Sequence, residues 1–261
     1  PTRRSSDLNV DDPTVGSTPD ATTSYTLHLT DVVNETPQLP AIIISEVAPW
    51  SSGNSPVGAD WFEVTNTTNS AIDITGWKMD DNSNSFATSV ALNGITSIAA
   101  GESVIFIETA DLPGKSAAFL SNWFGANPPA GLHIGSYTGS GVGLSSGGDA
   151  VNLFNSAGVL QANVTFGASP AGPFPTFNNA AGLNNAAISQ LSVAGVNTAF
   201  AAVNSANEIG SPGSIGKLFI SEVAPWSSGN SPVAADWFEI TNTLATAVDI
   251  TGWKIDDNSG S

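Results

Sequence analysis

Residues Ile44–Ser83 read ISEVAPWSSGNSPVGADWFEVTNTTNSAIDITGWKMDDNS, and residues Ile220–Ser259 repeat this stretch as ISEVAPWSSGNSPVAADWFEITNTLATAVDITGWKIDDNS. The copies start 176 residues apart and are identical at 33 of 40 positions. Differences such as Val64 against Ile240 keep an apolar side chain, as expected after duplication of one fold. Solenoid repeats have periods of about 20–50 residues, so the sequence predicts that each copy belongs to a whole domain.

Short strands separated by turns dominate the pattern around the first copy. Trp61–Thr65 alternates, with Phe62 and Val64 on one side of a strand and polar neighbours or tryptophan on the other. The one helical candidate is Ser116–Phe124, where apolar residues recur at helical spacing. Many strands with one helix favour an all-β sandwich or barrel. Further strands are predicted at Ile42–Val47, Ile72–Met79, Ser103–Glu108, Ala150–Phe154 and Val159–Phe166.

The composition of the chain excludes several classes of protein. Its 261 residues include six Lys and Arg against 23 Asp and Glu, for a net charge of −17. The strong negative charge predicts that the chain has no nucleic-acid partner, because phosphate binding depends on Lys and Arg. The chain has no cysteine, which excludes a disulfide scaffold and cysteine-based metal or nucleophile sites. No uninterrupted apolar run approaches the ~20 residues of a membrane span, so none is predicted.

The repeat and the shifts in composition divide the chain into four parts. Residues 1–8, PTRRSSDL, resemble a translated sequencing adapter and are interpreted as an artefact. Residues 9–40 are predicted to be a linker and, at Ser24–Val32, the last strand of a preceding domain. Residues 41–216 are predicted to form a complete sandwich that ends in a Gly-, Asn- and Ala-rich extension, and residues 217–261 a truncated second copy. The chain is therefore expected to be a fragment of a longer tandem array.

The search for catalytic groups finds weak candidates. Gly143–Gly147 (GLSSG) fits the G-x-S-x-G pattern, but a nucleophile elbow needs a strand before it and a helix after it. Here a Gly- and Ser-rich run precedes the motif and a predicted strand follows, and His133 is the one histidine of the domain. The repeated acids Glu46, Asp60 and Glu63 fit surface or capping roles as readily as acid–base chemistry. We therefore predict that this fragment is not an enzyme, and leave the full-length protein open.

Calcium is the one cofactor that the sequence suggests. Oxygen-bearing side chains cluster at Asp80, Asp81 and Asn82, and again at Asp256 and Asp257. Oxygen ligands at alternate positions suit Ca²⁺, although the invariant glycine and the closing glutamate of an EF-hand loop are missing here. A turn stabilised by Asp and Asn side chains explains the same residues. Both interpretations remain open at this point.

A tryptophan occupies the same loop in both copies. Trp50 and Trp226 each follow Ala-Pro and precede Ser-Ser-Gly-Asn. If such a ring is exposed, it can stack on a sugar or anchor a protein partner. The alternative is that the ring caps one end of the sandwich. We name these two tryptophans as candidate binding residues.

Five motifs in order resemble the lamin tail domain family. They are ISEV, DWFE(V/I)TN and (I/V)DITGWK(M/I)DD in both copies, then GESVIFIE and GGDAVNLFNSAG. The resemblance covers residues 41–216 and 217–261 and weakens over Gly167–Gly216. It implies an immunoglobulin-like β-sandwich, a non-enzymatic interaction module, and a setting in secreted or surface proteins of bacteria. The DNA association of nuclear members depends on a basic surface, which this chain lacks.

These observations lead to two functional hypotheses. The first is a non-catalytic module for binding, spacing or cell-surface attachment in a multidomain bacterial protein, located outside the cell or on its surface. Its partner would be a protein or a polysaccharide. The second is an accessory region of a secreted hydrolase, of nuclease or phosphoesterase type, whose catalytic domain lies outside this fragment. The sequence indicates neither the ligand nor the oligomeric state.

Overall fold

The computed structural model describes residues 8–10, 21–23, 40–50, 57–170, 172–178, 186–214, 218–225 and 235–242, and the single positions 250 and 255. The chain divides into two units, Pro1–Gln38 and Leu39–Ser261. In the first unit, β1 (Leu8–Val10) pairs with β2 (Ala21–Thr23) in antiparallel fashion, within the region predicted to be mainly linker. The strand predicted at Ser24–Val32 lies outside the described residues.

A five-stranded sheet contains the first copy of the repeat. Its order is β10-β9-β4-β3-β14, and all pairs are antiparallel except β10 with β9. Between Ile44 and Glu46, β3 has a bulge, so the residues after it change face relative to strict alternation. The strands are β3 (Ile42–Ala48), β4 (Trp61–Asn66), β9 (Ser103–Glu108), β10 (Ile134–Tyr137) and β14 (Phe177–Asn178).

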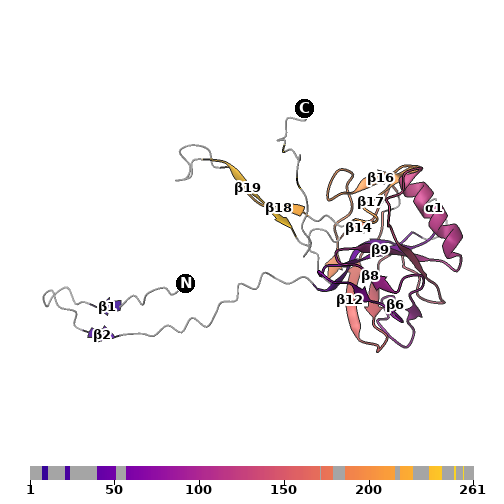
Figure 1. Cartoon of the computed structure of the whole chain (residues 1–261), viewed down its shortest axis with the longest axis horizontal. Coiled ribbons are helices and arrows are strands. Elements are labelled where there is room, and N and C mark those ends of the chain that lie inside the picture. Colours follow the sequence, from indigo (N-terminus) through magenta and orange to yellow (C-terminus); the bar gives the residue numbers. More distant parts are fainter. Residues whose placement is uncertain are drawn as a thin grey trace. The chain divides into compact units, whose positions relative to one another are not determined.

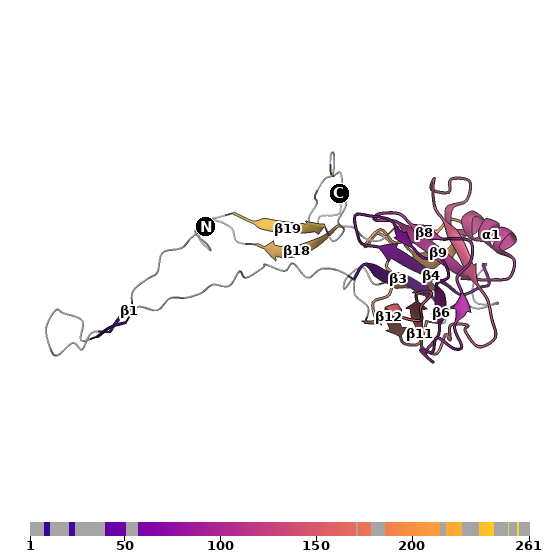
Figure 2. The same ribbon diagram turned by 60° about the horizontal axis from the view of Figure 1, so that its bottom comes forward.

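A second five-stranded sheet lies against the first (Figure 2). Its order is β15-β12-β11-β6-β7, and only β12 with β15 is parallel. The strands predicted at Ala150–Phe154 and Val159–Phe166 are confirmed and form a hairpin, with Gly158 at a positive φ of 79° in its turn. The strands are β6 (Lys78–Asp80), β7 (Val90–Ala91), β11 (Asp149–Phe154), β12 (Leu160–Phe166) and β15 (Ala187–Ile188), and β5 (Ile72–Asp73) pairs separately with β8 (Ser97–Ile98).

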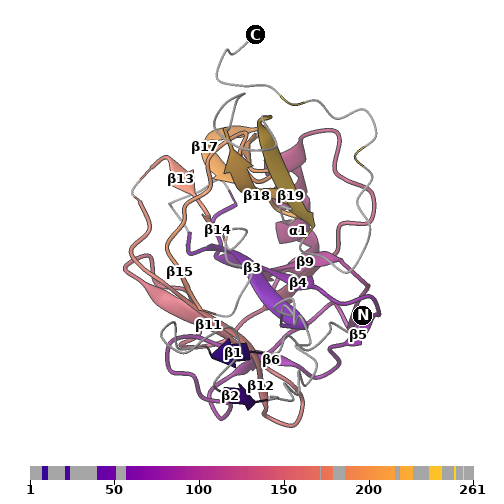
Figure 3. The same cartoon turned by 90° about the vertical axis from the view of Figure 1, so that its left-hand side faces the viewer.

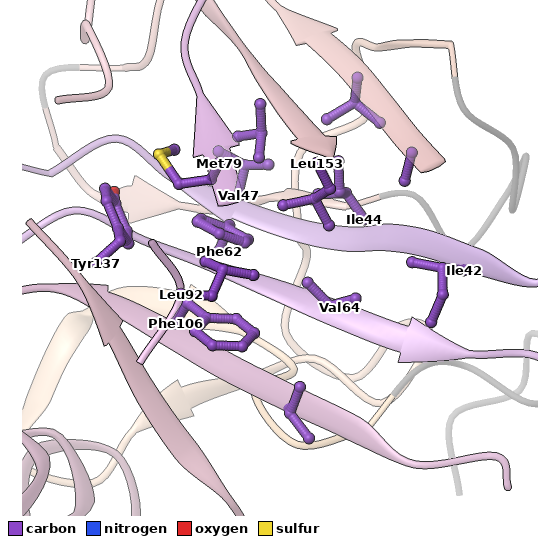
Figure 4. Packing of buried hydrophobic residues seen from close by; sticks show 14 of the residues in the cluster. Ile42, Ile44, Val47, Phe62, Val64, Met79, Leu92, Phe106, Tyr137 and Leu153 are labelled. Atoms are coloured by element: carbon purple, nitrogen blue, oxygen red, sulfur yellow. The ribbon is translucent and has the colours of Figure 1, made fainter. Parts of the chain in front are cut away.

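The main hydrophobic core fills the space between the two sheets (Figure 4). Phe62 and Val64 of β4 contribute from one sheet, and Met79 of β6 and Leu153 of β11 contribute from the other. These side chains are at most 1% exposed. Two antiparallel-rich sheets with interdigitating inner faces form a β-sandwich, which confirms the predicted architecture.

The opposite face of the first sheet is buried as well. A second core joins Trp50 and Trp61 to Trp123 of α1 (Leu112–Phe124), and α1 lies along one side of the sandwich (Figure 1). The first sheet is thus the middle of three layers, with β17 and α1 on one side and β11 and β12 on the other (Figure 3). The remaining strands on the side of α1 are β13 (Phe174–Pro175), β16 (Phe200–Ala202) and β17 (Ser205–Gly210), in the order β13-β17-β16.

The helix begins about one turn earlier than the sequence pattern predicts. The Asp111 carboxylate accepts a hydrogen bond from Gly114 N at 3.1 Å and so caps the helix. Pro113 lies in the first turn, where its missing N–H costs no helical hydrogen bond. The apolar periodicity begins only at Ser116, and for this reason the periodicity alone sets the boundary too late.

No helix in the described part of the chain is long and apolar enough to cross a membrane.

The second copy forms the same strand pair as the first. β18 (Leu218–Ala224) pairs with β19 (Trp237–Asn242), with Glu222 opposite Glu239. In the first copy Glu46 is opposite Glu63, and each first strand has its bulge at the equivalent serine. The two copies of the sequence repeat therefore pair their first two strands in the same register.

Candidate functional site

The predicted calcium loop follows β6 and is held together by its own polar groups. Asp80 is buried, and its carboxylate accepts hydrogen bonds from Ser83 Oγ at 2.5 Å and from Ser85 N at 2.7 Å. The Asp81 carboxylate accepts from Ser83 N at 2.9 Å, which makes an Asx turn. These hydrogen bonds are those expected for a turn stabilised by Asp side chains. Calcium binding stays a prediction. Asp256 and Asp257 lie outside the described residues.

Within the described ranges, no group of three or more His, Cys, Asp or Glu side chains is arranged to hold a metal ion. Asn82 instead belongs to a different feature of the same loop. Together with strands β11 and β12 it borders an open polar recess of about 590 Å³, a volume that includes open solvent. The residues lining this recess are Asn82, Asn84, Gly148, Asp149, Ala150, Asn152, Asn163 and Thr165.

The polar recess lies on the outer face of the second sheet. Asn152 is opposite Asn163 and Ala150 is opposite Thr165, while the alternate residues of both strands point into the main core. Small residues make the surface concave. Ala150 has only a methyl group, and a Cβ added to Gly148 would lie 3.2 Å from the Phe166 carbonyl oxygen. At Gly148 φ is also 115°, so a side chain there is disfavoured by the backbone.

The polar groups of the recess are mostly neutral amides. Asn152 is 1% exposed, and its Nδ2 donates to the Asp81 carbonyl oxygen at 2.5 Å. Among the described residues, its Oδ1 has no hydrogen-bond partner. The one carboxylate, Asp149, accepts from the backbone N–H groups of Asn82, Ala150 and Ser145 at 2.8–3.0 Å. Its oxygens therefore hold the walls of the recess in place.

A pair of glutamates on β3 and β4 is buried beside Thr176, Ser211 and Gly213. Glu46 and Glu63 lie opposite each other on β3 and β4, both fully buried, so the prediction of surface roles is wrong for them. Glu46 accepts from Thr176 Oγ1 and from Ser211 N, the latter at 2.8 Å. Glu63 accepts from Gly213 N at 2.6 Å. The two carboxyl groups thereby fasten the backbone that leads toward β18.

Burial is the main cause of the altered acidity of this pair. It raises the pKa of Glu46 to about 8, with a further upward contribution from the charge of Glu63. Burial likewise raises the pKa of Glu63 to about 7, against the opposing effect of its hydrogen bonds from Ser45 and Gly213. The folded domain therefore keeps protons on these groups at pH values where an ordinary glutamate is ionised.

A second acidic group lies where β4 begins and β9 ends. Burial raises the pKa of Asp60 to about 7, opposed by the hydrogen bond from Leu144 N and reinforced by the Glu108 carboxylate. Burial, with Asp60 and Glu108 nearby, also raises the pKa of Tyr137 well above its usual range. Asp60 is buried, so a surface role is wrong for this residue too. Its carboxylate accepts a hydrogen bond from Leu144 N, which holds the 138–148 loop over the core.

Trp50 does not have the exposure that the binding hypothesis needs. The side chain is fully buried and stacks on Trp123 at 6.5 Å between ring centroids. It also meets Trp61 edge-on at 6.1 Å. Stacking on a ligand is therefore wrong for Trp50, because the 112–124 helix provides the surface that covers it. Trp226 lies outside the described residues.

The G-x-S-x-G serine lies in a turn directly before β11. Ser145 Oγ accepts a hydrogen bond from Gly147 N at 3.1 Å. His133 is 62% exposed, and its Nδ1 lies 2.5 Å from Glu102 Oε1. A strand rather than a helix follows the serine, so Ser145 does not occupy a nucleophile elbow.

The architecture defines a two-sheet β-sandwich module with a polar recess on one outer face. The chain belongs to the lamin tail domain family, whose sequence profile matches residues 35–168 and 211–261. This family has an immunoglobulin-like β fold, which confirms the predicted fold class and the resemblance. The profile omits residues 169–210, most of the segment where the sequence resemblance weakens. A search of curated proteins found no match.

The sequence pattern missed the residues that line the recess on β11 and β12. A signal for them existed, because Gln161, Asn163 and Thr165 are polar at every second position of a predicted strand. Such alternation marks the outer face of a sheet but does not distinguish a flat surface from a concave one. The concavity depends on the 82–84 loop, which is about 70 residues away in the sequence.

Proposed function

We propose that the chain is a non-catalytic binding and spacing module of a multidomain extracellular protein. The observation that supports this proposal best is the repeated strand register of β3–β4 and β18–β19. Proteins that repeat a complete sandwich commonly use each copy as one unit of an array, which suits a role in spacing or presenting a surface. The extracellular setting is inferred from the bacterial members of the family.

The attachment of the connecting segment supports the spacing role. Ser211 and Gly213 donate their backbone N–H groups to Glu46 and Glu63 only a few residues before β18 begins. This segment is thus anchored to the sandwich at a defined point, which limits the directions in which the next copy can extend. An array of such modules would be stiffer than one joined by free linkers.

Enzyme assays on the purified chain test the non-catalytic part of the proposal. We expect no turnover of bis-p-nitrophenyl phosphate, single-stranded DNA or p-nitrophenyl glycosides above the buffer rate. Turnover that disappears in the variant Ser145→Ala would contradict the proposal. The Ser146→Ala variant is the matched control, because it changes the neighbouring serine of the same turn.

Hydrogen exchange tests the anchored connection. We expect the amides of Ser211 and Gly213 to exchange as slowly as those within β4, because both are donors to buried carboxylates. Exchange at the rate of an unstructured peptide would show that the segment is free.

The second hypothesis is that the chain is an accessory region of a secreted hydrolase. The reading frame on both sides distinguishes it from the spacing module, because a nuclease or phosphoesterase domain in the same protein would favour the accessory role.

A further inference from the structure

We propose that the polar recess between the 82–84 loop, β11 and β12 binds an uncharged carbohydrate through its asparagine side chains. The inference rests on the proposed binding role and specifies the ligand class for it. Three observations carry it: the concave surface, the chemistry of its lining, and a buried acceptor without a partner on one of the lining residues.

The buried acceptor is Oδ1 of Asn152. The side chain is 1% exposed, its Nδ2 is fixed by the Asp81 carbonyl oxygen, and its Oδ1 has no partner in the described part of the chain. A buried polar atom without a partner costs roughly 1–3 kcal/mol, so a hydroxyl donor that reaches it is favoured. Because Nδ2 fixes the amide plane, the acceptor is already oriented before a ligand arrives.

The other side chains match the hydrogen-bonding character of a sugar. Each asparagine offers two donors and an acceptor, and each sugar hydroxyl both donates and accepts. Asn163 is directly opposite Asn152, and Thr165 lies two residues further along the same face of β12. Neighbouring hydroxyl groups of one ring can therefore bind to these side chains together.

The charge of the recess favours a neutral ligand. No Lys or Arg lines it, and its one carboxylate belongs to Asp149. An anionic ligand would be repelled, both here and by the net charge of −17. A calcium ion prefers several free carboxylate oxygens, whereas the Asp149 oxygens already accept three backbone N–H groups. The N–H donors of the surrounding amides also have no role toward a cation.

The absence of large apolar groups from the lining argues against a peptide. The apolar contribution comes from Gly148 and Ala150, which offer no pocket for an anchoring side chain. Peptide recognition generally depends on buried apolar or aromatic anchors. A ligand recognised mainly through hydroxyl groups fits the same surface without such an anchor.

The test is a nuclear magnetic resonance titration of the ¹⁵N-labelled full chain. The probes are cellotriose, maltotriose, laminaritriose and triacetylchitotriose, each added to 20 mM, with 10 mM CaCl₂ and a Gly-Ser hexapeptide as separate arms. We expect at least one trisaccharide to shift the side-chain amide resonances of Asn152 and Asn163 in a saturable way. Neither calcium nor the peptide should move them.

Two matched variants make the result specific to the recess. Asn163→Ala should weaken binding of the active trisaccharide at least tenfold, because it removes one of the two facing amides. Gln161→Ala is the control, since Gln161 lies on the same face of β12 but does not line the recess. It should leave the affinity unchanged, and both variants should melt within about 2 °C of the parent chain because their side chains face outward.

Three results would overturn the inference. They are no shift of these amides with any trisaccharide, equal affinity in Asn163→Ala, and a shift caused by calcium or the peptide alone. A negative titration would leave the non-catalytic spacing role intact, because that role depends on the enzyme and hydrogen-exchange experiments. Turnover in the enzyme assays would instead contradict the proposed function, whatever the recess binds.

Discussion

The β3–β4 and β18–β19 strand pairs share a sequence and a register, yet their side chains have different surroundings. Phe62 is fully buried, whereas its counterpart Phe238 is 40% exposed. Val47 is likewise buried, whereas Val223 is 65% exposed. The pairing of the two strands thus follows from the repeated motif itself. The burial of their side chains depends on the segments that pack against them.

The difference is greatest for the acidic residues. Glu63 is enclosed by a serine hydroxyl and by the backbone of Gly213, but its counterpart Glu239 is exposed. In the first copy the enclosing atoms come from residue 45 and from a segment about 150 residues downstream. One sequence motif therefore gives a buried acid in one context and an exposed acid in the other.

Removal of the central tryptophan should have the largest effect on this comparison. Trp61→Ala deletes a fully buried ring that contacts Phe119 at 5.4 Å and Trp123 at 5.8 Å between centroids. We expect it to lower the free energy of unfolding by about 3–5 kcal/mol, measured by urea denaturation. Trp237→Ala, at the half-buried counterpart, should cost less than about 1 kcal/mol. Equal losses would show that the two pairs are equally enclosed.

Exchange of the natural residues at one aligned position should have the next largest effect. Val64 is 1% exposed in the main core, so Val64→Ile inserts a methylene group into packed surroundings. The expected loss of stability is about 1–3 kcal/mol. The reverse change in the second copy, Ile240→Val, should change stability by at most about 0.5 kcal/mol because the side chain is 42% exposed. Chemical denaturation of both variants checks this asymmetry.

The buried glutamates should give the first copy a characteristic dependence on pH. The folded-state pKa values of Glu46 (about 8) and Glu63 (about 7) exceed the ordinary value of 4.5, so the folded state binds more protons than the unfolded state. Stability from this source is fully present below pH 4.5 and is lost as the pH rises toward 8. The slope is at most about 1.4 kcal/mol per pH unit for each group.

The variant Glu46→Gln tests this cause, because glutamine keeps an acceptor for Ser211 N but does not ionise. It should flatten the fall in unfolding free energy between pH 5 and pH 8, measured by urea denaturation at several pH values. Glu239→Gln, at the exposed position of the second copy, is the control for the change of glutamate to glutamine, and the fall between pH 5 and pH 8 should remain in this variant. A parent chain whose stability rises over this range would contradict the assignment.

Loss of the helix cap should have the smallest effect. Asp111→Ala removes the acceptor for Gly114 N at the start of the helix whose Trp123 packs against Trp61. The expected cost is about 1 kcal/mol, measured as a lower thermal midpoint. Asp111→Ser keeps a capping oxygen and should restore most of the loss. If the serine variant is as unstable as the alanine variant, capping is not the cause.

Most strands of the sandwich could be predicted from the sequence, but Ile72–Met79, predicted as one strand, is two short strands, β5 and β6, in different sheets. The alternation in Trp61–Thr65 and the Asn155–Gly158 turn depend on neighbouring residues, and both are present in the structure. The candidate sites could be predicted only in part. Asn82, a predicted calcium ligand, lines the polar recess, and the calcium prediction stays untested; Trp50, a predicted binding residue, is buried. Asn152 and Asn163 were not named, although they face each other across two predicted strands.

The sequence by itself determined the duplication, the β-sandwich class and the two faces of each strand, because these follow from motif identity and from a two-residue period. It could not determine what covers each face. Only the tertiary structure decided that Thr176, Ser211 and Gly213 enclose the buried glutamates of β3 and β4, and that the 82–84 loop turns a flat sheet surface into a recess. The physical reason is that burial arises from contacts between segments far apart in the chain, and no local pattern encodes those contacts.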